Sequence, residues 1–271
     1  MNKRYLYGIL VIAIITVAGS LIYLNSQGKS NSSGNAAYDD LPVPQSLLSQ
    51  LSISTNVANT NNVTQLQNQR VISSAPHSIN ASPLTQDGKP LVLYIGAEYC
   101  PYCGAERWAM IIALQRFGNF TGLKYMTSSA SDNPPSVPTF TFYNSTYTSQ
   151  YITFVAVETT TNKFVNGTYP TLQTPTAFQT AIFGHFNPSG SIPFIDIANH
   201  SIQIGSNYDP GTVFAGQNWT SVATAIGNPS TYQSKAIVGG ANLLTAQICE
   251  ADGNQPASVC SQQYVTALEK P

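Results

Sequence analysis

The longest apolar stretch of the chain is residues 5–24, YLYGILVIAIITVAGSLIYL, which contain no charged side chain. An uncharged run of this length is enough to cross the ~30 Å hydrocarbon core of a bilayer. Lys3 and Arg4 precede it, so the positive-inside rule predicts a cytoplasmic N-terminus and an extracellular main domain. The alternative is a cleaved signal peptide with a small-residue site at residues 18–20. We therefore expect a single-pass anchor in the cell membrane, or failing that an exported and processed chain.

After this anchor segment (1–24), the pattern predicts a polar tether with short helices over 25–85 and a folded domain over 86–271. The domain opens with a continuous apolar run at 90–96, which is typical of a strand buried on both faces, and an amphipathic helix follows from Pro101. The further expected strands lie within 122–128, 139–159 (two strands turning near Asn144), 194–198 and 201–204, and the further helices within 174–186, 219–229 and 230–253. This alternation of strands and helices favours an α/β fold.

The composition changes the picture of the surface. Charged residues make up 8% of the chain and the formal net charge is -1, whereas soluble domains usually carry about 25% charged residues. Because no basic cluster is available to neutralise phosphates, we expect no nucleic-acid partner. The chain instead carries Asn-x-Ser/Thr sequons, which predict a glycosylated exterior surface. They begin at Asn31, Asn62, Asn80, Asn119, Asn144, Asn166, Asn199 and Asn218.

Two of the four cysteines, Cys100 and Cys103, stand where the predicted strand at 90–96 meets the helix. Zinc needs about four N or S ligands in closely spaced pairs, and Cys249 and Cys260 are too far away to supply them, so we expect no metal. A purely structural disulfide would close a very short loop and contribute little stability. Redox chemistry suits this placement, because helix N–H groups stabilise the thiolate of a cysteine just ahead of a helix. We therefore expect Cys100 to attack and Cys103 to resolve, with no diffusible cofactor.

The other two cysteines, Cys249 and Cys260, flank a loop rich in turn residues. In an oxidising exterior they are expected to form a structural disulfide between the last long helix and the C-terminal tail. A second redox pair that relays electrons from the first is the alternative, but neither cysteine is placed at the start of a predicted helix.

Residues 90–107, PLVLYIGAEYCPYCGAER, resemble the active-site strand and helix of the thioredoxin superfamily, and Cys-Pro-Tyr-Cys is typical of glutaredoxins. The resemblance implies a thioredoxin-like fold with an inserted segment at about 120–190 and a C-terminal helical segment with the disulfide. It also implies a cis-proline loop facing the cysteines. Pro193 in SIPFIDIANHSIQIG fits this loop, and Ile192 would contact the client through its backbone. Pro138 is the alternative cis-proline.

The sequence departs from the superfamily at the buried acidic residue expected six positions before the first cysteine, where it has Tyr94. Glu98 either substitutes for that acid or is an exposed loop residue. Glu106 and Arg107 lie one turn into the predicted helix, where they would form a salt-bridged rim or a solvated face.

The chain as a whole resembles an uncharacterised archaeal family with an N-terminal anchor, a thioredoxin-like body, the motif IPFIDIAN and a C-terminal cysteine pair. Two functions follow. The first is a membrane-anchored thiol–disulfide oxidoreductase whose partners are exported client proteins and a separate redox partner; Tyr99 and Tyr102 would form an apolar platform for the client. The second is a non-catalytic, glycosylated cell-surface scaffold or binding protein on the same fold. Burial of Cys100, or a glycan on Asn119 or Asn199 beside it, would favour the scaffold.

Overall fold

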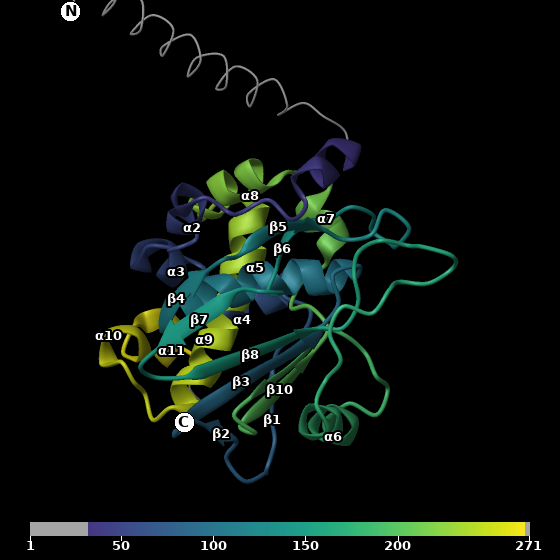
Figure 1. The fold of residues 1–271 in the computed structure, drawn as a ribbon. Coiled ribbons are helices and arrows are strands. Elements are labelled where there is room, and N and C mark those ends of the chain that lie inside the picture. The colour runs from purple at the N-terminus through teal and green to yellow at the C-terminus, as the bar shows by residue number, and fades with distance from the viewer. Residues whose placement is uncertain (1–31, 269–271) are drawn as a thin grey trace, which may run out of the picture.

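The computed structural model describes residues 32–268, which form a mixed α/β fold (Figure 1). The predicted transmembrane segment at 5–24 and the sequon at Asn31 lie outside these residues. Between residues 32 and 268 no helix is long and apolar enough to cross a membrane. The expectation of an α/β class is confirmed.

A six-stranded sheet forms the centre of the fold. Its strands are β1 (His77–Ser78), β2 (Thr85–Gln86), β3 (Lys89–Gly96), β8 (Thr153–Glu158), β9 (Phe194–Ile197) and β10 (Ser201–Ile204). The central strand β3 is parallel to β8 on one side and antiparallel to β9 on the other, and β9 is followed by antiparallel β10. The predicted strands at 194–198 and 201–204 are therefore present, joined by a turn in which Asn199 has a φ of 56°.

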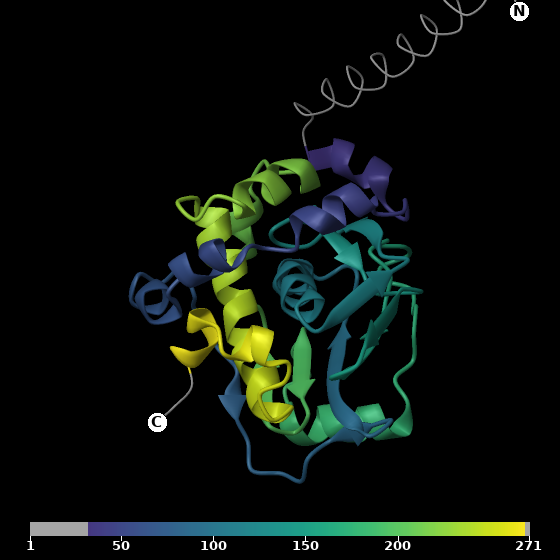
Figure 2. The same cartoon turned by 90° about the vertical axis from the view of Figure 1, so that its left-hand side faces the viewer.

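Helices cover both faces of this sheet. Since side chains alternate along a strand, Val92 and Tyr94 point to one face and pack into the larger core with α5 (Pro101–Gln115) and α9 (Gly239–Ala251) (Figure 2). The opposite face packs against α6 (Ala177–Phe186), which lies below the sheet in Figure 1. The buried apolar residues of the strands on this face of the sheet are Leu91, Leu93, Ile95, Val157, Phe194 and Ile202. The result is a three-layer α/β/α arrangement.

The close packing of α5 on α9 explains the glycine pair that weakens the helical pattern of 230–253. A Cβ atom at Gly240 would lie 3.3 Å from the Cβ of Ala109 and 3.0 Å from Oδ1 of Asn207. Glycine here lets the two helix backbones approach closely, which compensates for its low helix propensity.

Four further strands form two small antiparallel pairs: β4 (Gly118–Thr121) with β7 (Thr146–Ser149), and β5 (Lys124–Thr127) with β6 (Pro138–Thr141). The prediction of two strands with a turn near Asn144 was wrong on one point, because β6, β7 and β8 are three strands. β6 and β7 do not pair with each other, since each finds a partner in the segment that follows α5. The predicted insertion at about 120–190 therefore contains β5, β6, β7 and part of β4. It also contains β8 and α6, which belong to the main layers.

The predicted tether, 25–85, contains η1 (Ser32–Tyr38), α2 (Gln45–Gln50), α3 (Thr55–Thr60) and α4 (Val63–Asn68). Side chains of its short helices and of the turns beside them are buried in the larger core. They are Leu47, Leu48, Leu51, Ala58, Val63, Leu66 and Ile72. Although this segment is mostly polar, its apolar residues recur at intervals and pack it against α9 and the neighbouring helices.

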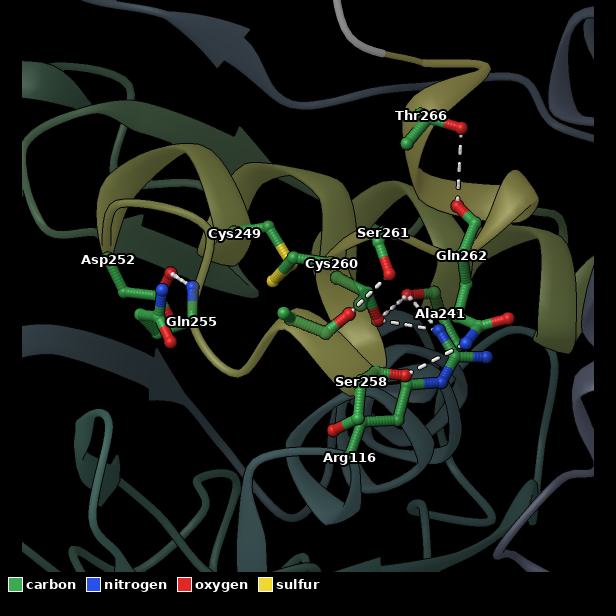
Figure 3. The surroundings of a disulfide bond; sticks show 12 residues. Arg116, Ala241, Cys249, Asp252, Gln255, Ser258, Cys260, Ser261, Gln262 and Thr266 are labelled. Carbon is green, nitrogen blue, oxygen red and sulfur yellow. Dashed lines mark hydrogen bonds between the residues drawn. A yellow bond between two sulfur atoms is a disulfide. The ribbon is translucent and has the colours of Figure 1, made fainter.

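The C-terminal part consists of α7 (Pro210–Phe214), α8 (Trp219–Ile226), η2 (Ser234–Val238), α9, α10 (Ala257–Cys260) and α11 (Gln263–Thr266). The predicted disulfide between Cys249 and Cys260 is present, with the two Cα atoms 5.6 Å apart (Figure 3). Arg116 lies beneath it, donates from Nη1 to the carbonyl of Ala241 at 3.3 Å, and stacks on the ring of Tyr264. The disulfide and this arginine both hold the C-terminal helices to α9.

Candidate active site

The first cysteine of the Cys-Pro-Tyr-Cys motif is the N-cap of α5. β3 ends at Gly96, and Cys100 has extended backbone angles (φ -74°, ψ 122°) before the helix begins at Pro101. Proline suits this first helical position because its φ is already helical and no N–H is needed there. The Sγ atom of Cys100 accepts a hydrogen bond from the backbone N–H of Cys103 at 3.2 Å. Both cysteines are free thiols.

The two thiols differ in acidity. The pKa of Cys100 is lowered, first by its side-chain hydrogen bond with Cys103 and further by the backbone N–H of Cys103 and the charge of Arg107, against the effect of burial. Burial raises the pKa of Cys103, and the neighbouring Cys100 raises it further. Cys100 is therefore the thiol of the pair that ionises more readily, which matches the expected division into an attacking and a resolving cysteine.

The segment at Pro193 lies directly against the cysteines. The Sγ of Cys100 is 3.9 Å from the carbonyl oxygen of Ile192, and both cysteines pack in one small cluster with Ile192. The Ile192–Pro193 peptide bond is cis, as expected, whereas that before Pro138 is not among the cis bonds of the described residues. Pro138 instead begins β6, where its carbonyl accepts a hydrogen bond from Trp108 Nε1 at 2.8 Å. The loop at Pro193 is thus the one that faces the cysteine pair.

Two loops also border the site, at the right of Figure 1. The ring of Tyr99 stacks on that of Tyr169, with centroids 4.1 Å apart and an interplanar angle of 7°, and the Tyr99 carbonyl accepts from the N–H of Ser129. The predicted platform residue Tyr99 is therefore packed under the loop 159–172, whereas Tyr102 is 43% exposed and Phe164 of that loop is 53% exposed. Nothing in the local pattern indicates Tyr169, because its stacking on Tyr99 joins residues far apart in the sequence, and Phe164 reaches the site only through its contact with Tyr169.

Cys100 and Cys103 are largely covered by these segments. Only 5% of Cys100 and none of Cys103 is accessible to solvent. Tyr99 and Ile192 are the partly buried residues that pack against the pair. The Cys100 thiol therefore has little access to solvent.

The expectation of a charged rim at Glu106 and Arg107 was wrong. Both are fully buried, because α5 is enclosed by the sheet, by β6 and by α9. Arg107 forms a two-pronged ion pair with Glu158, donating from Nε to Oε1 at 2.9 Å and from Nη2 to Oε2 at 2.7 Å. Its Nη2 also donates to the carbonyl of Ala97 at 2.7 Å, in the loop that leads to the cysteines.

The interpretation of Glu98 as an exposed loop residue was also wrong. Its side chain is 4% exposed and accepts a hydrogen bond from Thr141 Oγ1 at 2.7 Å. Burial raises the pKa of Glu98 to about 7. Burial also raises the pKa of Glu106 to about 7, and Glu106 accepts the N–H of Asn207 at 2.8 Å.

Because of its buried carboxyl groups, we expect the protein to be more stable in mild acid than at neutral pH. Burial raises the pKa values of five carboxyls, namely Asp39 to about 6, Glu98 to about 7, Glu106 to about 7, Asp196 to about 6 and Asp252 to about 6. A folded-state pKa above the unfolded value gives stability that is complete below the unfolded pKa and is lost as the pH rises through the folded pKa. The free energy of unfolding should therefore fall between about pH 4 and about pH 7. The lowered pKa of Asp209 has the opposite sign, but it acts below its ordinary pKa and so outside this range.

For Glu98 alone, the change from 4.5 to about 7 corresponds to roughly 3 kcal/mol. Urea unfolding midpoints, measured across this pH range, would test the prediction. Glu98→Gln, which cannot ionise, should flatten the pH dependence, and a midpoint that rises with pH would contradict it.

The predicted glycosylation sites are placed mostly on the surface. Five of the sequon asparagines are exposed, and two, Asn199 and Asn218, are half-buried. The exposed ones are Asn62, Asn80, Asn119, Asn144 and Asn166. The Nδ2 of Asn199 donates to the carbonyl of Ser82 at 2.8 Å, which a glycan would disturb.

Neither Asn119 nor Asn199 lies beside the cysteines. Asn119 follows the C-terminal end of α5, and Asn199 follows the C-terminal end of β9, whereas Cys100 adjoins the opposite ends of both elements. A glycan at either position would therefore be attached at the end of its element that is opposite Cys100. Among residues 32–268, no cluster of three or more His, Cys, Asp or Glu side chains could hold a metal ion.

Comparison with known proteins gives one match. The chain is similar over residues 75–169 to a family described as "Domain of unknown function (DUF929)". Neither a curated protein nor a solved structure matches the chain. The matched segment begins before β3, contains both cysteines of the motif and the whole of α5, and ends at Tyr169, so the family likeness is to the half of the site that carries the thiols.

Proposed function

We propose that the protein is a membrane-anchored, extracytoplasmic thiol–disulfide oxidoreductase that acts on exported proteins through Cys100 and Cys103. One observation carries this proposal. The free thiol of Cys100 caps α5, has a lowered pKa and lies against the carbonyl of Ile192, with the second thiol one turn along the helix. This combination provides an attacking thiolate, a resolving thiol and a backbone acceptor for an extended client.

The order of elements supports a thioredoxin-like fold for the domain. A parallel crossover from β3 through α5 to β8 is followed by α6, the antiparallel β9–β10 hairpin and α9. This is the arrangement that the resemblance of residues 90–107 implies. On this interpretation the strand pairs β4–β7 and β5–β6 and the loop 159–172 are additions to the fold, and the loop 159–172 lies at the cysteine end, where Tyr169 stacks on Tyr99.

The exchange proceeds in two steps. The Cys100 thiolate attacks one sulfur of a client disulfide, so that a Cys100–client bond forms and the other client sulfur leaves as a thiolate. Cys103 then loses its proton to that thiolate and attacks Cys100, which releases the second client sulfur and leaves a Cys100–Cys103 disulfide. Two electrons pass to the client, and a second dithiol protein must restore the pair; the reverse sequence oxidises a client dithiol.

The exposed aromatic residues near the cysteines suit an unfolded client. Tyr102, in the first turn of α5, and Phe164, which packs against Tyr169, present exposed apolar surface. The Ile192 carbonyl next to Cys100 would pair with an extended backbone. Phe164→Ser is expected to lower kcat/KM about fivefold for an unfolded protein disulfide, while a small disulfide such as oxidised glutathione is processed at an unchanged rate. Phe178→Ser is the matched control, since Phe178 is 55% exposed but lies on α6. Equal losses in the two variants would contradict a client surface at Phe164.

Residues 5–24 are the proposed single-pass anchor, with the N-terminus in the cytoplasm and the main domain outside the cell. The exposed sequon asparagines are the proposed glycan acceptors. Treatment of the native protein with a glycosidase should raise its electrophoretic mobility if these asparagines carry glycans. An unchanged mobility would remove glycosylation from the proposal.

A non-catalytic cell-surface scaffold is the second candidate, and the near-complete burial of both thiols favours it. The reduction potential of the Cys100/Cys103 pair decides between the two functions. Catalytic pairs have potentials between roughly -270 and -120 mV, whereas structural disulfides lie below about -300 mV. We expect a value inside the catalytic range, with Cys100 alkylated selectively in the native protein. A pair that resists reduction, or reacts only after unfolding, would favour the scaffold.

A further inference from the structure

Tyr94 is fully buried, and its hydroxyl has no hydrogen-bond partner among the residues that the structure describes. Its ring packs edge-on against Phe142, with centroids 5.2 Å apart. Buried tyrosine hydroxyls usually find an acceptor, and leaving one unpaired costs stability. A phenylalanine would fill the same space without that cost, so the hydroxyl itself needs an explanation.

Gly96 allows the hydroxyl of Tyr94 to approach the cysteines. The two residues point to the same face of β3, two positions apart. A Cβ atom at Gly96 would lie 3.0 Å from Cε1 of Tyr94 and closer still to its hydroxyl oxygen. The tyrosine side chain therefore lies along the strand over Gly96, and its hydroxyl reaches the end of β3 that leads to Cys100.

A second unpaired donor lies in the same buried region. Arg107 and Cys103 are four residues apart on α5 and so share one face of the helix. The Nε and Nη2 atoms of Arg107 are bonded to Glu158, whereas its buried Nη1 has no partner among the described residues. The guanidinium carbon is 5.9 Å from the centroid of the Tyr94 ring.

Electrostatic effects link these groups to the resolving thiol. Arg107 also donates from Nη2 to the carbonyl of Ala97, which packs in one cluster with both cysteines. Burial raises the pKa of Tyr94, the charge of Arg107 lowers it, and the charges of Cys103 and Cys100 raise it further. The charge of Arg107 lowers the pKa of Cys103, against the larger effect of burial. Of the two donors that lack an acceptor among the described residues, one thus lies at the end of β3 that leads to the cysteines and the other lies one turn along α5 from Cys103, a buried thiol that must ionise in the second step.

We propose that the Tyr94 hydroxyl and the free Nη1–H of Arg107 form a donor site for the Cys103 thiolate. The inference rests on the proposed function and assigns a role to the residue found where the superfamily has a buried acid. When Cys103 gives its proton to the departing client thiolate, the two donors stabilise the negative charge on its sulfur. That charge disappears when Cys103 bonds to Cys100 and the client sulfur leaves with the electron pair. Because both groups donate, they lower the cost of the thiolate without taking up the proton.

The test separates the two steps with dithiobis(nitrobenzoate), mixed with the reduced full-length chain. In the first phase Cys100 attacks the reagent, forms a mixed disulfide and releases one coloured nitrothiobenzoate. In the second phase Cys103 attacks Cys100 and releases another, leaving the Cys100–Cys103 disulfide. The first phase depends on reagent concentration and reports Cys100, whereas the second is intramolecular and reports Cys103.

Two variants each remove one fully buried hydroxyl. Tyr94→Phe is expected to slow the second phase about tenfold near neutral pH and to raise its apparent pKa by about one unit, because one donor is lost. The first phase should change less than about twofold, and the stability should stay the same or rise. Tyr208→Phe is the control. Its hydroxyl donates to the carbonyl of Ala105 at 2.6 Å on the same helix, so this variant should lose stability and keep both rates.

The outcomes distinguish the inference from the function on which it rests. If the wild-type chain shows no first phase, Cys100 is not reactive, and the proposed function and the donor site both fail. If both phases occur but Tyr94→Phe leaves the rate and pH profile of the second unchanged, the donor site alone is overturned. A second phase slowed to the same extent in Tyr208→Phe would likewise overturn it, since the effect would then follow from general loosening of α5.

Discussion

Cys100→Ser is expected to abolish disulfide exchange, with a loss of at least about a thousandfold in kcat/KM, because a serine hydroxyl is not ionised and does not form the mixed disulfide. The structure gives this cysteine the lowered pKa of the pair and the position at the N-terminus of α5. Reduction of an insulin-like disulfide substrate by the reduced protein, with a dithiol as the final reductant, would measure the loss.

Cys103→Ser provides the complementary result. The first attack should proceed, but the mixed disulfide between Cys100 and the client should persist, because the resolving thiol is missing. Non-reducing electrophoresis would show this complex, and the Cys100→Ser variant would be its control. If Cys103→Ser accumulates no complex while Cys100→Ser retains activity, the roles of the two cysteines are reversed or absent.

Much of the main sheet could be predicted because its signals are local. The run at 90–96 has the β-branched and aromatic residues of a buried strand, and the Cys-Pro pair after it marks a helix start. The hairpin around Asn199 combines alternating strands with a residue that tolerates positive φ. Pro193 was preferred to Pro138 as the cis-proline because a predicted hairpin and a short helix follow it, as the resemblance to the thioredoxin superfamily requires.

The rest depends on pairings between distant segments. β5 and β6 resemble any short strands, and nothing local indicates that each lies beside the other and away from β7. Arg107 and Glu158 were not recognised as a pair, since a charged residue in an amphipathic helix is normally placed on its solvated face. Their burial follows from the enclosure of α5 by elements that the sequence does not place.

Tyr94 illustrates the same limit in the candidate site. In the sequence, Tyr94 stands where the thioredoxin superfamily has a buried acidic residue, and the missing acid favoured a non-catalytic protein. In the structure it lies over Gly96 and beside Arg107, and its hydroxyl has no partner among the described residues. The spacing of Tyr94 and Gly96 was available in the sequence, but its meaning required the positions of α5 and the thiols.

The ion pair behind the cysteines is expected to be the most sensitive part of the fold. Arg107 and Glu158 are both fully buried, and Arg107 also holds the carbonyl of Ala97. Arg107→Met would leave the Glu158 carboxylate without its partner in the interior, so the free energy of unfolding should fall by about 3–5 kcal/mol. Urea unfolding followed by fluorescence would measure the change.

The double variant Arg107→Met/Glu158→Met is the matched control, because it removes both charges and fills the space with apolar side chains. Replacing a buried pair in this way is often neutral or stabilising by roughly 1–4 kcal/mol, so stability should return to the wild-type level or above it. Exchange activity should not return with it, since the charge that lowers the pKa of Cys100 and the donor proposed for the Cys103 thiolate would both be gone. A double variant that is stable and fully active would show that Arg107 serves only the packing of α5 against β8, whereas a stable but slow one would separate its electrostatic role from its structural role.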